Sequence, residues 1–146
     1  MAVITLDILI EGMRRDDVFT WLSDFEHHFA FMQAGFPKAS KENDTHFSLP
    51  FQAGYKTRSL GYHFERAEET HGGRRVLVKT TGKRLTGHLH LSLRTMKPSS
   101  NTLITLHMDY DPGSVLGAVL QSDIQQVLER NFRLCLESIK TSLENN

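Results

Sequence analysis

Histidine is the residue type with the most chemistry to offer in this sequence of 146 residues, which contains eight of them. An imidazole can bind a metal, move a proton or change its charge near neutral pH. Five of the eight lie in a stretch of alternating apolar and polar residues: His46, His63, His88, His90 and His107. Each stands at the parity opposite to that of its apolar neighbours, and alternate side chains of a strand point to opposite faces. We therefore expect all five on the outer, polar face of a sheet.

The turns between the predicted strands limit how these histidines pair, because both members of a cross-strand pair face the same side. One consistent register gives the pairs His63–Lys79, Lys79–His88, His88–Asp109 and His90–His107. Imidazole and carboxylate ligands suit zinc or nickel, so this row could bind a metal. No Cys-x-x-Cys or helical ligand spacing supports that hypothesis. The alternatives are a pH-dependent contact or a solvated polar face; we expect the solvated face, with no metal and no other cofactor.

Groups that could catalyse a reaction are scarce elsewhere. The sequence contains no phosphate-binding loop, no dinucleotide fingerprint and no nucleophile motif. Cys135 falls on the apolar face of a predicted helix, where a thiol is usually an inert small hydrophobe. By parity, Arg66 is the one charged side chain at an inward strand position, where it could hold a carboxylate or phosphate. This shortage of inward acids and bases favours binding over catalysis, and we predict no catalytic residue.

The first third of the chain is predicted to form a strand and two short helices. Residues 3–11 alternate like a half-buried strand. Asp16 and Asp17 then open a helix, where carboxylates suit the helix dipole. A second short helix covers residues 25–32 and is capped by Asp24.

The rest of the chain is predicted to form strands and one long helix. Residues 38–44 form a polar loop, and residues 46–110 then alternate as about five antiparallel strands with one apolar face. A helix N-capped by Ser114 follows and extends to about Leu143 with one apolar stripe.

This order of elements resembles the helix-grip fold of the START-like (SRPBCC) superfamily, which includes polyketide cyclases, birch-pollen-allergen-like carriers and lipid-transfer domains. The resemblance covers essentially the whole chain. The resemblance rests on the segment Asp17–Asp24 after the opening strand, the strands separated by glycine-containing turns and the terminal Leu/Ile/Phe helix. It implies an α+β fold, with a curved antiparallel sheet of about six strands wrapped on a long C-terminal helix. We expect one domain over residues 1–146.

The resemblance also implies an apolar cavity between the sheet and the long helix. Its expected lining consists of inward-facing strand residues and the facing side of the helix: Phe47, Leu49, Phe51, Tyr62, Phe64, Arg66, Val78, Leu91, Leu93, Met108, Tyr110, Leu128 and Phe132. The same residues would form an ordinary filled core, and the sequence does not separate the two readings. Tyr62 and Tyr110 are the better ligand contacts, because a buried phenol seeks a hydrogen-bond partner.

Composition limits the partners. Seventeen basic residues balance seventeen acidic ones, so no nucleic-acid partner is expected, although Arg74, Arg75, Lys79, Lys83 and Arg84 cluster around one strand and could touch phosphate. No apolar run approaches the ~18–20 residues of a membrane span, and no signal-peptide pattern opens the chain. We expect a cytoplasmic protein without stable membrane insertion. The aromatic-rich segment of residues 25–36 could gate a ligand or form a homodimer contact.

The sequence therefore predicts a protein that binds or transports a small hydrophobic molecule of the lipid, polyketide or pigment type. One alternative is a cyclase/dehydratase-type enzyme on the same fold, which would need polar groups converging inside a cavity. The other is an interaction module with a filled core, resembling co-chaperone domains of this superfamily.

Overall fold

The computed structural model describes residues 1–71, 73–97, 100–113 and 118–145. Its elements follow the order β1 (Ala2–Ile10), α1 (Arg15–Ser23), α2 (Glu26–Gly35), β2 (Ser40–Asn43), β3 (His46–Ala53), β4 (Lys56–Thr70), β5 (Gly73–Thr81), β6 (Gly87–Met96), β7 (Asn101–Tyr110) and α3 (Ala118–Glu144). None of the helices in these residues is long and apolar enough to span a membrane.

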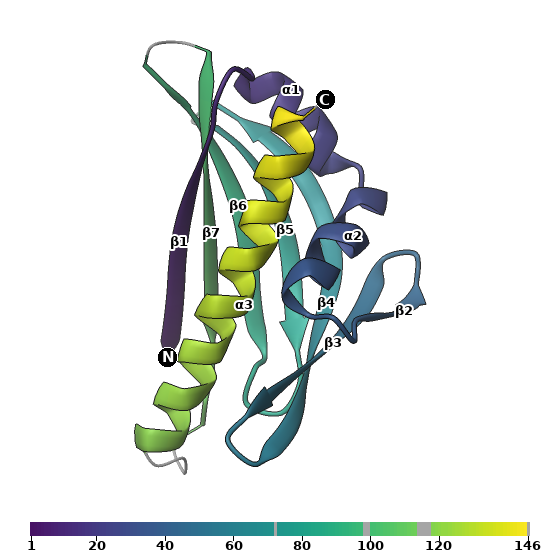
Figure 1. Ribbon diagram of the computed structural model, residues 1–146, viewed down its shortest axis with the longest axis vertical. Helices are drawn as coiled ribbons and strands as arrows, with labels where there is room; N and C mark the ends of the chain where they lie inside the picture. The colour runs from purple at the N-terminus through teal and green to yellow at the C-terminus, as the bar shows by residue number, and fades with distance from the viewer. Residues whose placement is uncertain (72, 98–99, 114–117, 146) are drawn as a thin grey trace.

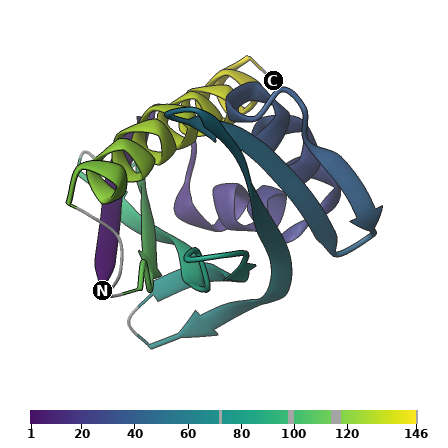
Figure 2. The same cartoon turned by 90° about the horizontal axis from the view of Figure 1, so that it is seen from below.

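The strands form one antiparallel sheet in the order β1-β7-β6-β5-β4-β3-β2. The N-terminal strand β1 pairs with β7, and every other strand pairs with its neighbour in the sequence. The sheet curves around α3, which crosses its concave face, while α1 and α2 close one side (Figures 1 and 2). This confirms the helix-grip architecture.

The sheet has seven strands where about six were predicted. The additional strand is β2, which lies in the predicted polar loop and has all four residues exposed. A strand buried on neither face carries no apolar alternation, so the sequence pattern does not reveal it.

The helices bury the faces that periodicity predicts. Val18 and Leu22 of α1 are buried, and Asp16 and Asp17 lie in its first turn. The α3 stripe is buried at Ile124, Leu128, Phe132, Cys135 and Ile139. Among the described residues, α3 is the one long helix, and this stripe covers the apolar face of the sheet.

Asp24 and Ser114 were predicted to cap the helices α2 and α3. Asp24 follows α1, and its carboxylate accepts a hydrogen bond from the Glu26 backbone N–H at 3.1 Å, while Phe25 occupies the N-cap position of α2. Ser114, the predicted cap of α3, lies outside the described residues.

Candidate functional site

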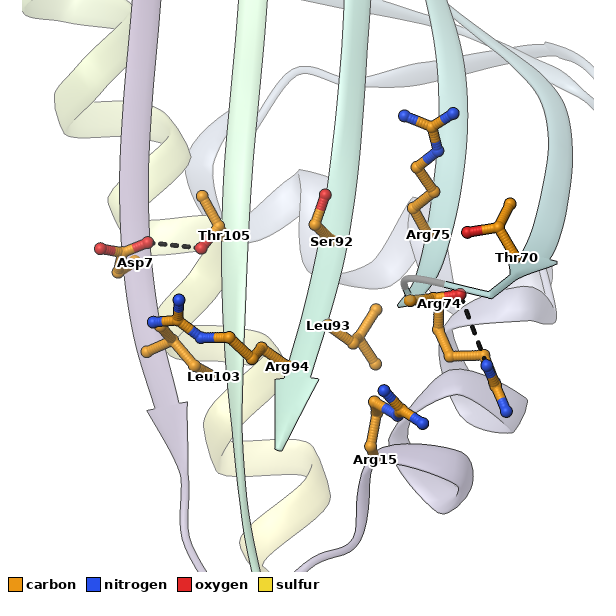
Figure 3. Close-up of a pocket in the computed structure, with 11 residues that line it drawn as sticks. Asp7, Arg15, Thr70, Arg74, Arg75, Ser92, Leu93, Arg94, Leu103 and Thr105 are labelled. Atoms are coloured by element: carbon orange, nitrogen blue, oxygen red, sulfur yellow. Dashed lines mark hydrogen bonds between the residues drawn. The ribbon is translucent and has the colours of Figure 1, made fainter. Parts of the chain in front are cut away.

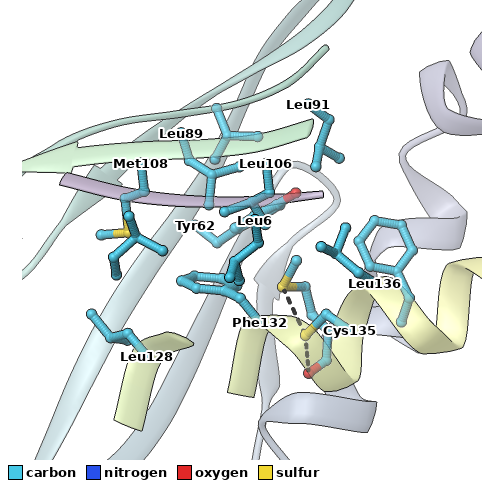
Figure 4. Packing of buried hydrophobic residues seen from close by; sticks show 14 of the residues in the cluster. Leu6, Tyr62, Leu89, Leu91, Leu106, Met108, Leu128, Phe132, Cys135 and Leu136 are labelled. Atoms are coloured by element: carbon cyan, nitrogen blue, oxygen red, sulfur yellow. Dashed lines mark hydrogen bonds between the residues drawn. The ribbon is translucent and has the colours of Figure 1, made fainter. Parts of the chain in front are cut away.

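The predicted cavity lining lies inside the grip. All of its residues except Phe64 and Arg66 are buried. Figure 4 shows how side chains of the sheet and of α3 meet: Tyr62 and Met108 on one side, Leu128 and Phe132 on the other. Their exposed fractions are all 0%. A void large enough for a water molecule would give its lining an exposed surface, so among the described residues this space is filled by side chains.

Arg66 does not point inward, and this part of the prediction is wrong. The pairing of β4 with β5 shifts register between Phe64 and Arg66, which is a β-bulge. One extra residue in a strand reverses the parity of everything that follows. Arg66 therefore turns to the outer face, where its side chain is 60% exposed and its Nε lies 3.1 Å from Oε2 of Glu68.

A buried polar pair, which we did not predict from the sequence, joins α2 to β4. His28 is fully buried, and its Nε2 lies 2.7 Å from the Leu22 carbonyl oxygen. A carbonyl can only accept, so Nε2 carries the proton and donates it. The bare Nδ1 then accepts the hydrogen bond of the Tyr62 hydroxyl at 2.8 Å. Burial lowers the pKa of His28 to about 4 and raises that of Tyr62 well above its usual value, so both side chains are neutral at pH 7.

The signals for this pair are present in the sequence. His28 has the helical spacing of Phe25 and Met32, which places it on an inward face, and Tyr62 has inward strand parity. Their sequence separation of 34 residues hides the contact.

The second predicted phenol has the opposite environment. Tyr110 at the end of β7 is 1% exposed, and its hydroxyl has no hydrogen-bond partner among the described residues. Burial, and secondarily the charge of Glu129, raise the pKa of Tyr110. It is thus a buried donor available to a ligand, whereas Tyr62 is satisfied within the protein.

Cys135 packs beneath α2, with its Sγ 3.8 Å from both the carbonyl oxygen and the sulfur of Met32. Burial raises the pKa of this thiol to about 12, so it stays protonated and unreactive at neutral pH.

The predicted histidine register is confirmed in every pair. His63 lies opposite Lys79, Lys79 opposite His88, His88 opposite Asp109 and His90 opposite His107. The His90 and His107 rings stack with centroids 5.0 Å apart, and the His46 and His63 rings stack at 3.6 Å. Among the described residues, no three His, Cys, Asp or Glu side chains are grouped so that they could hold a metal ion.

A groove with a volume of about 730 Å³ lies at one end of the outer face (Figure 3). Arginines line it, but they are largely paired with carboxylates. Arg74 Nε lies 3.4 Å from Asp16 and 3.6 Å from Glu69, and Arg75 pairs with Glu68. The predicted basic cluster is thus divided, because these arginines begin β5 while Lys83 and Arg84 follow its other end.

A smaller pocket of about 340 Å³, which we call the mouth pocket, lies between the end of α2, β3 and α3. It is lined by Ala34, Gly35, Pro37, Lys38, Pro50, Phe51, Gln52, Thr57, Arg130, Asn131 and Leu134. Of the predicted ligand-contacting residues, Phe51 lies here. Its ring meets that of Phe36 edge-on at 6.2 Å, and Phe36 in turn meets Phe132 at 5.4 Å. This aromatic group connects the pocket with the core.

No profile of a known protein family matches the chain, and no curated protein matches its sequence. Solved structures do match. TTHA0849 from Thermus thermophilus superimposes with a TM-score of 0.67 at 12% identity, covering 97% of each chain. A START superfamily protein from Mycobacterium smegmatis gives a TM-score of 0.63 at 10% identity, covering 98% of this chain and 97% of that one. The chain has the START-like fold.

A third structure with the START-like fold is the Zhui aromatase/cyclase from Streptomyces sp. R1128. It gives a TM-score of 0.60 at 13% identity, covering 98% of this chain and 93% of that one. At such low identities the likeness establishes the fold alone, because unrelated functions share one fold.

Proposed function

We propose that the protein binds a small hydrophobic molecule between the sheet and α3, and that the ligand enters at the mouth pocket. The observation that carries the proposal is the pocket itself, an apolar recess at the edge of the grip with Phe51 on its wall. Its volume of about 340 Å³ is at the lower end of the range of small-molecule sites.

The route inward runs through the aromatic rings. Phe36, Phe51 and Phe132 touch edge to face, so rotation of these rings would give the ligand access to the predicted lining residues. Since the core is filled, we propose that the ligand makes its own space by displacing them. The buried hydroxyl of Tyr110 is a hydrogen-bond donor that a ligand inside the core could engage.

The rim of the pocket favours an amphiphile with an anionic group. Lys38 and Arg130 line the pocket, are exposed, and have no carboxylate within 4.0 Å among the described residues. An acidic head group could pair with them while the apolar part rests on Phe51 and Leu134. The lining holds no histidine, cysteine or carboxylate, which supports binding rather than acid–base catalysis.

A second candidate rests on the filled core. A protein whose interior is occupied by its own side chains needs no ligand to be stable, which favours an interaction module of the START-like fold. The two candidates differ in one measurable property, the entry of an apolar molecule at the mouth pocket.

The experiment compares two alanines of α2. Ala30 and Ala34 are both exposed, but Ala34 alone lines the pocket. Fluorescence titration with 8-anilinonaphthalene-1-sulfonate at pH 7.5, with decanoate as competitor, measures binding. We expect Ala34→Trp to fill the pocket and weaken binding at least about tenfold, a loss of about 1.4 kcal/mol, and Ala30→Trp to leave it unchanged. Equal affinities of the two variants for the probe, or no binding of the probe by the wild type, would overturn the proposal in favour of the interaction module.

A further inference from the structure

Four cationic residues lie at the end of the sheet where the β3–β4 and β5–β6 turns lie. They line a cleft of about 500 Å³, which we call the basic cleft, together with three small residues: Lys56, Thr57, Arg58, Ser59, Gly82, Lys83 and Arg84. Thr57 also lines the mouth pocket, so the two hollows are neighbours. Nothing in the proposed hydrophobic binding uses the four cations of the cleft.

The charge of the cleft is uncompensated. Its lining includes no carboxylate, and among the described residues none of the four cations has an ion-pair partner within 4.0 Å. The outer groove of Figure 3 differs, because Arg74 and Arg75 there pair with Asp16, Glu68 and Glu69. Gathering four like charges costs repulsion that a bound anion would offset. The position of the charges therefore selects the basic cleft as the anion site.

The backbone of the β5–β6 turn holds one of these cations in an unusual conformation. Arg84 has φ 63°, the one positive φ outside glycine among the described residues. Residues with bulky side chains are uncommon in this left-handed region, where they are strained. The Arg84 guanidinium donates a hydrogen bond to the Pro112 carbonyl at 3.4 Å, which fixes its direction. Glycine would fit this turn better, so Arg84 adopts this conformation at an energetic cost.

Arg58 supplies a second observation. Its side chain is partly buried, and its Nε has no hydrogen-bond partner among the described residues. Buried guanidinium donors are nearly always satisfied, so this Nε is open to a further acceptor, as are the Nε atoms of Arg15 and Arg74 at the outer groove. Arg58 faces Phe51 across the β3–β4 pair, which holds it on a regular strand.

We propose that the basic cleft binds a phosphate group. Guanidinium forks match the oxygens of a phosphate, and lysines add point charges around it. A volume of about 500 Å³ exceeds that of a phosphate ion, so the cleft has room for a phosphate group that is part of a larger molecule. It is either a soluble phosphate ester or the head group of a phospholipid, and these two sources share the same recognition chemistry.

The test uses calorimetric titration with glycerol 3-phosphate, and flotation with phosphatidylcholine vesicles with or without phosphatidic acid. Arg84→Gly removes one guanidinium and relieves the turn, so we expect it to fold at least as stably as the wild type. It should nevertheless bind about tenfold more weakly, the loss expected for one charge-assisted hydrogen bond.

A matched pair of double variants separates the site from net charge. Arg58→Ala/Lys83→Ala lowers the charge of the cleft by two, and Arg94→Ala/Arg133→Ala lowers that of the exposed surface elsewhere by two. We expect the first to bind about 100-fold more weakly, as two lost charged contacts imply, and the second to bind like the wild type.

The outcomes are distinct. Binding of glycerol 3-phosphate that the cleft variants weaken supports a soluble ester. Binding only to vesicles with phosphatidic acid, again weakened by those variants, supports a lipid head group. Equal losses in both double variants would show a nonspecific charge effect and overturn the proposal. Binding to neither glycerol 3-phosphate nor the vesicles would also overturn it. Because Ala34→Trp changes the mouth pocket and leaves the basic cleft intact, the test of hydrophobic binding and the test of phosphate binding can fail separately.

Discussion

At the scale of single residues, the main finding is a neutral polar pair inside an otherwise apolar core. His28 and Tyr62 satisfy each other, and the Leu22 carbonyl takes the remaining donor of the imidazole. Such a pair contributes to stability only while both members are present and uncharged, because a buried polar group without its partner costs about 1–3 kcal/mol. This dependence gives two predictions.

The first prediction concerns acid. Burial lowers the pKa of His28 from its usual 6.5 to about 4, so the unfolded chain takes up a proton before the folded protein does. The stabilisation is complete above pH 6.5 and is lost as the pH falls toward 4, by about 3 kcal/mol in total. Lowered pKa values of His63 and His90, caused mainly by burial and then by the neighbouring His46 or His107, act with the same sign.

Urea unfolding at intervals from pH 7.5 to pH 4 measures this loss. The double variant His28→Leu/Tyr62→Phe replaces both partners by apolar groups and should reduce the pH dependence, while His71→Ala, at an exposed position, should keep it. An unchanged slope in the double variant would show that His28 is not the group responsible.

The second prediction contrasts the two buried phenols. Tyr62→Phe leaves Nδ1 of His28 without its donor and should lower the free energy of unfolding by about 1–3 kcal/mol. Tyr110→Phe removes a hydroxyl that has no partner among the described residues and should be neutral or stabilising. Chemical denaturation of the two variants at pH 7.5 measures the difference. A larger loss for Tyr110→Phe would show that its hydroxyl is bonded in solution.

At the scale of elements, the third prediction concerns the approach of α2 to α3. A Cβ on Gly35 would collide with the Asn131 carbonyl and with Sγ of Cys135, so only glycine permits this packing. Gly35→Ala should cost at least about 1–3 kcal/mol, as for other overpacked sites. Gly73→Ala is the control, because the nearest atom to its added Cβ is the Leu93 carbonyl oxygen at 4.0 Å. Thermal unfolding compares them, and equal melting temperatures would show that the helices can separate at little cost.

The elements also show what the sequence can and cannot predict. Alternation and turn positions predict the strands and even the cross-strand partners of the histidines, because period and register are local properties of neighbouring strands. The bulge after Phe64 leaves no mark in the alternation, and it turned Arg66 outward. The contact of His28 with Tyr62 and the meeting of the two turns at the basic cleft both join segments that are distant in the sequence. No local sequence pattern encodes contacts of this kind.

At the scale of the whole molecule, the proposed binding site between the sheet and α3 is already occupied by the protein's own side chains. Binding inside the grip must exchange contacts among side chains for contacts with the ligand, so its affinity depends on how readily the interior yields. Phe132 is where this exchange would begin, since its ring is fully buried and contacts Phe36, which in turn contacts Phe51 of the mouth pocket. A smaller side chain at Phe132 should therefore lower the free energy of unfolding and raise the affinity for an apolar ligand.

The fourth prediction follows from this opposition. Phe132→Ala should cost about 3–5 kcal/mol of stability and leave a cavity behind the mouth pocket. The same variant should bind 8-anilinonaphthalene-1-sulfonate more tightly than the wild type, because no ring has to be displaced. Ile139→Ala also opens the core along α3, but Ile139 does not belong to the aromatic group of Phe36, Phe51 and Phe132, so we expect it to lose about 2–4 kcal/mol without gaining affinity. Fluorescence titration and urea unfolding of the three proteins measure both quantities. If both variants gained affinity equally, the probe would be reporting a loosened core, and the mouth pocket would not be the entrance.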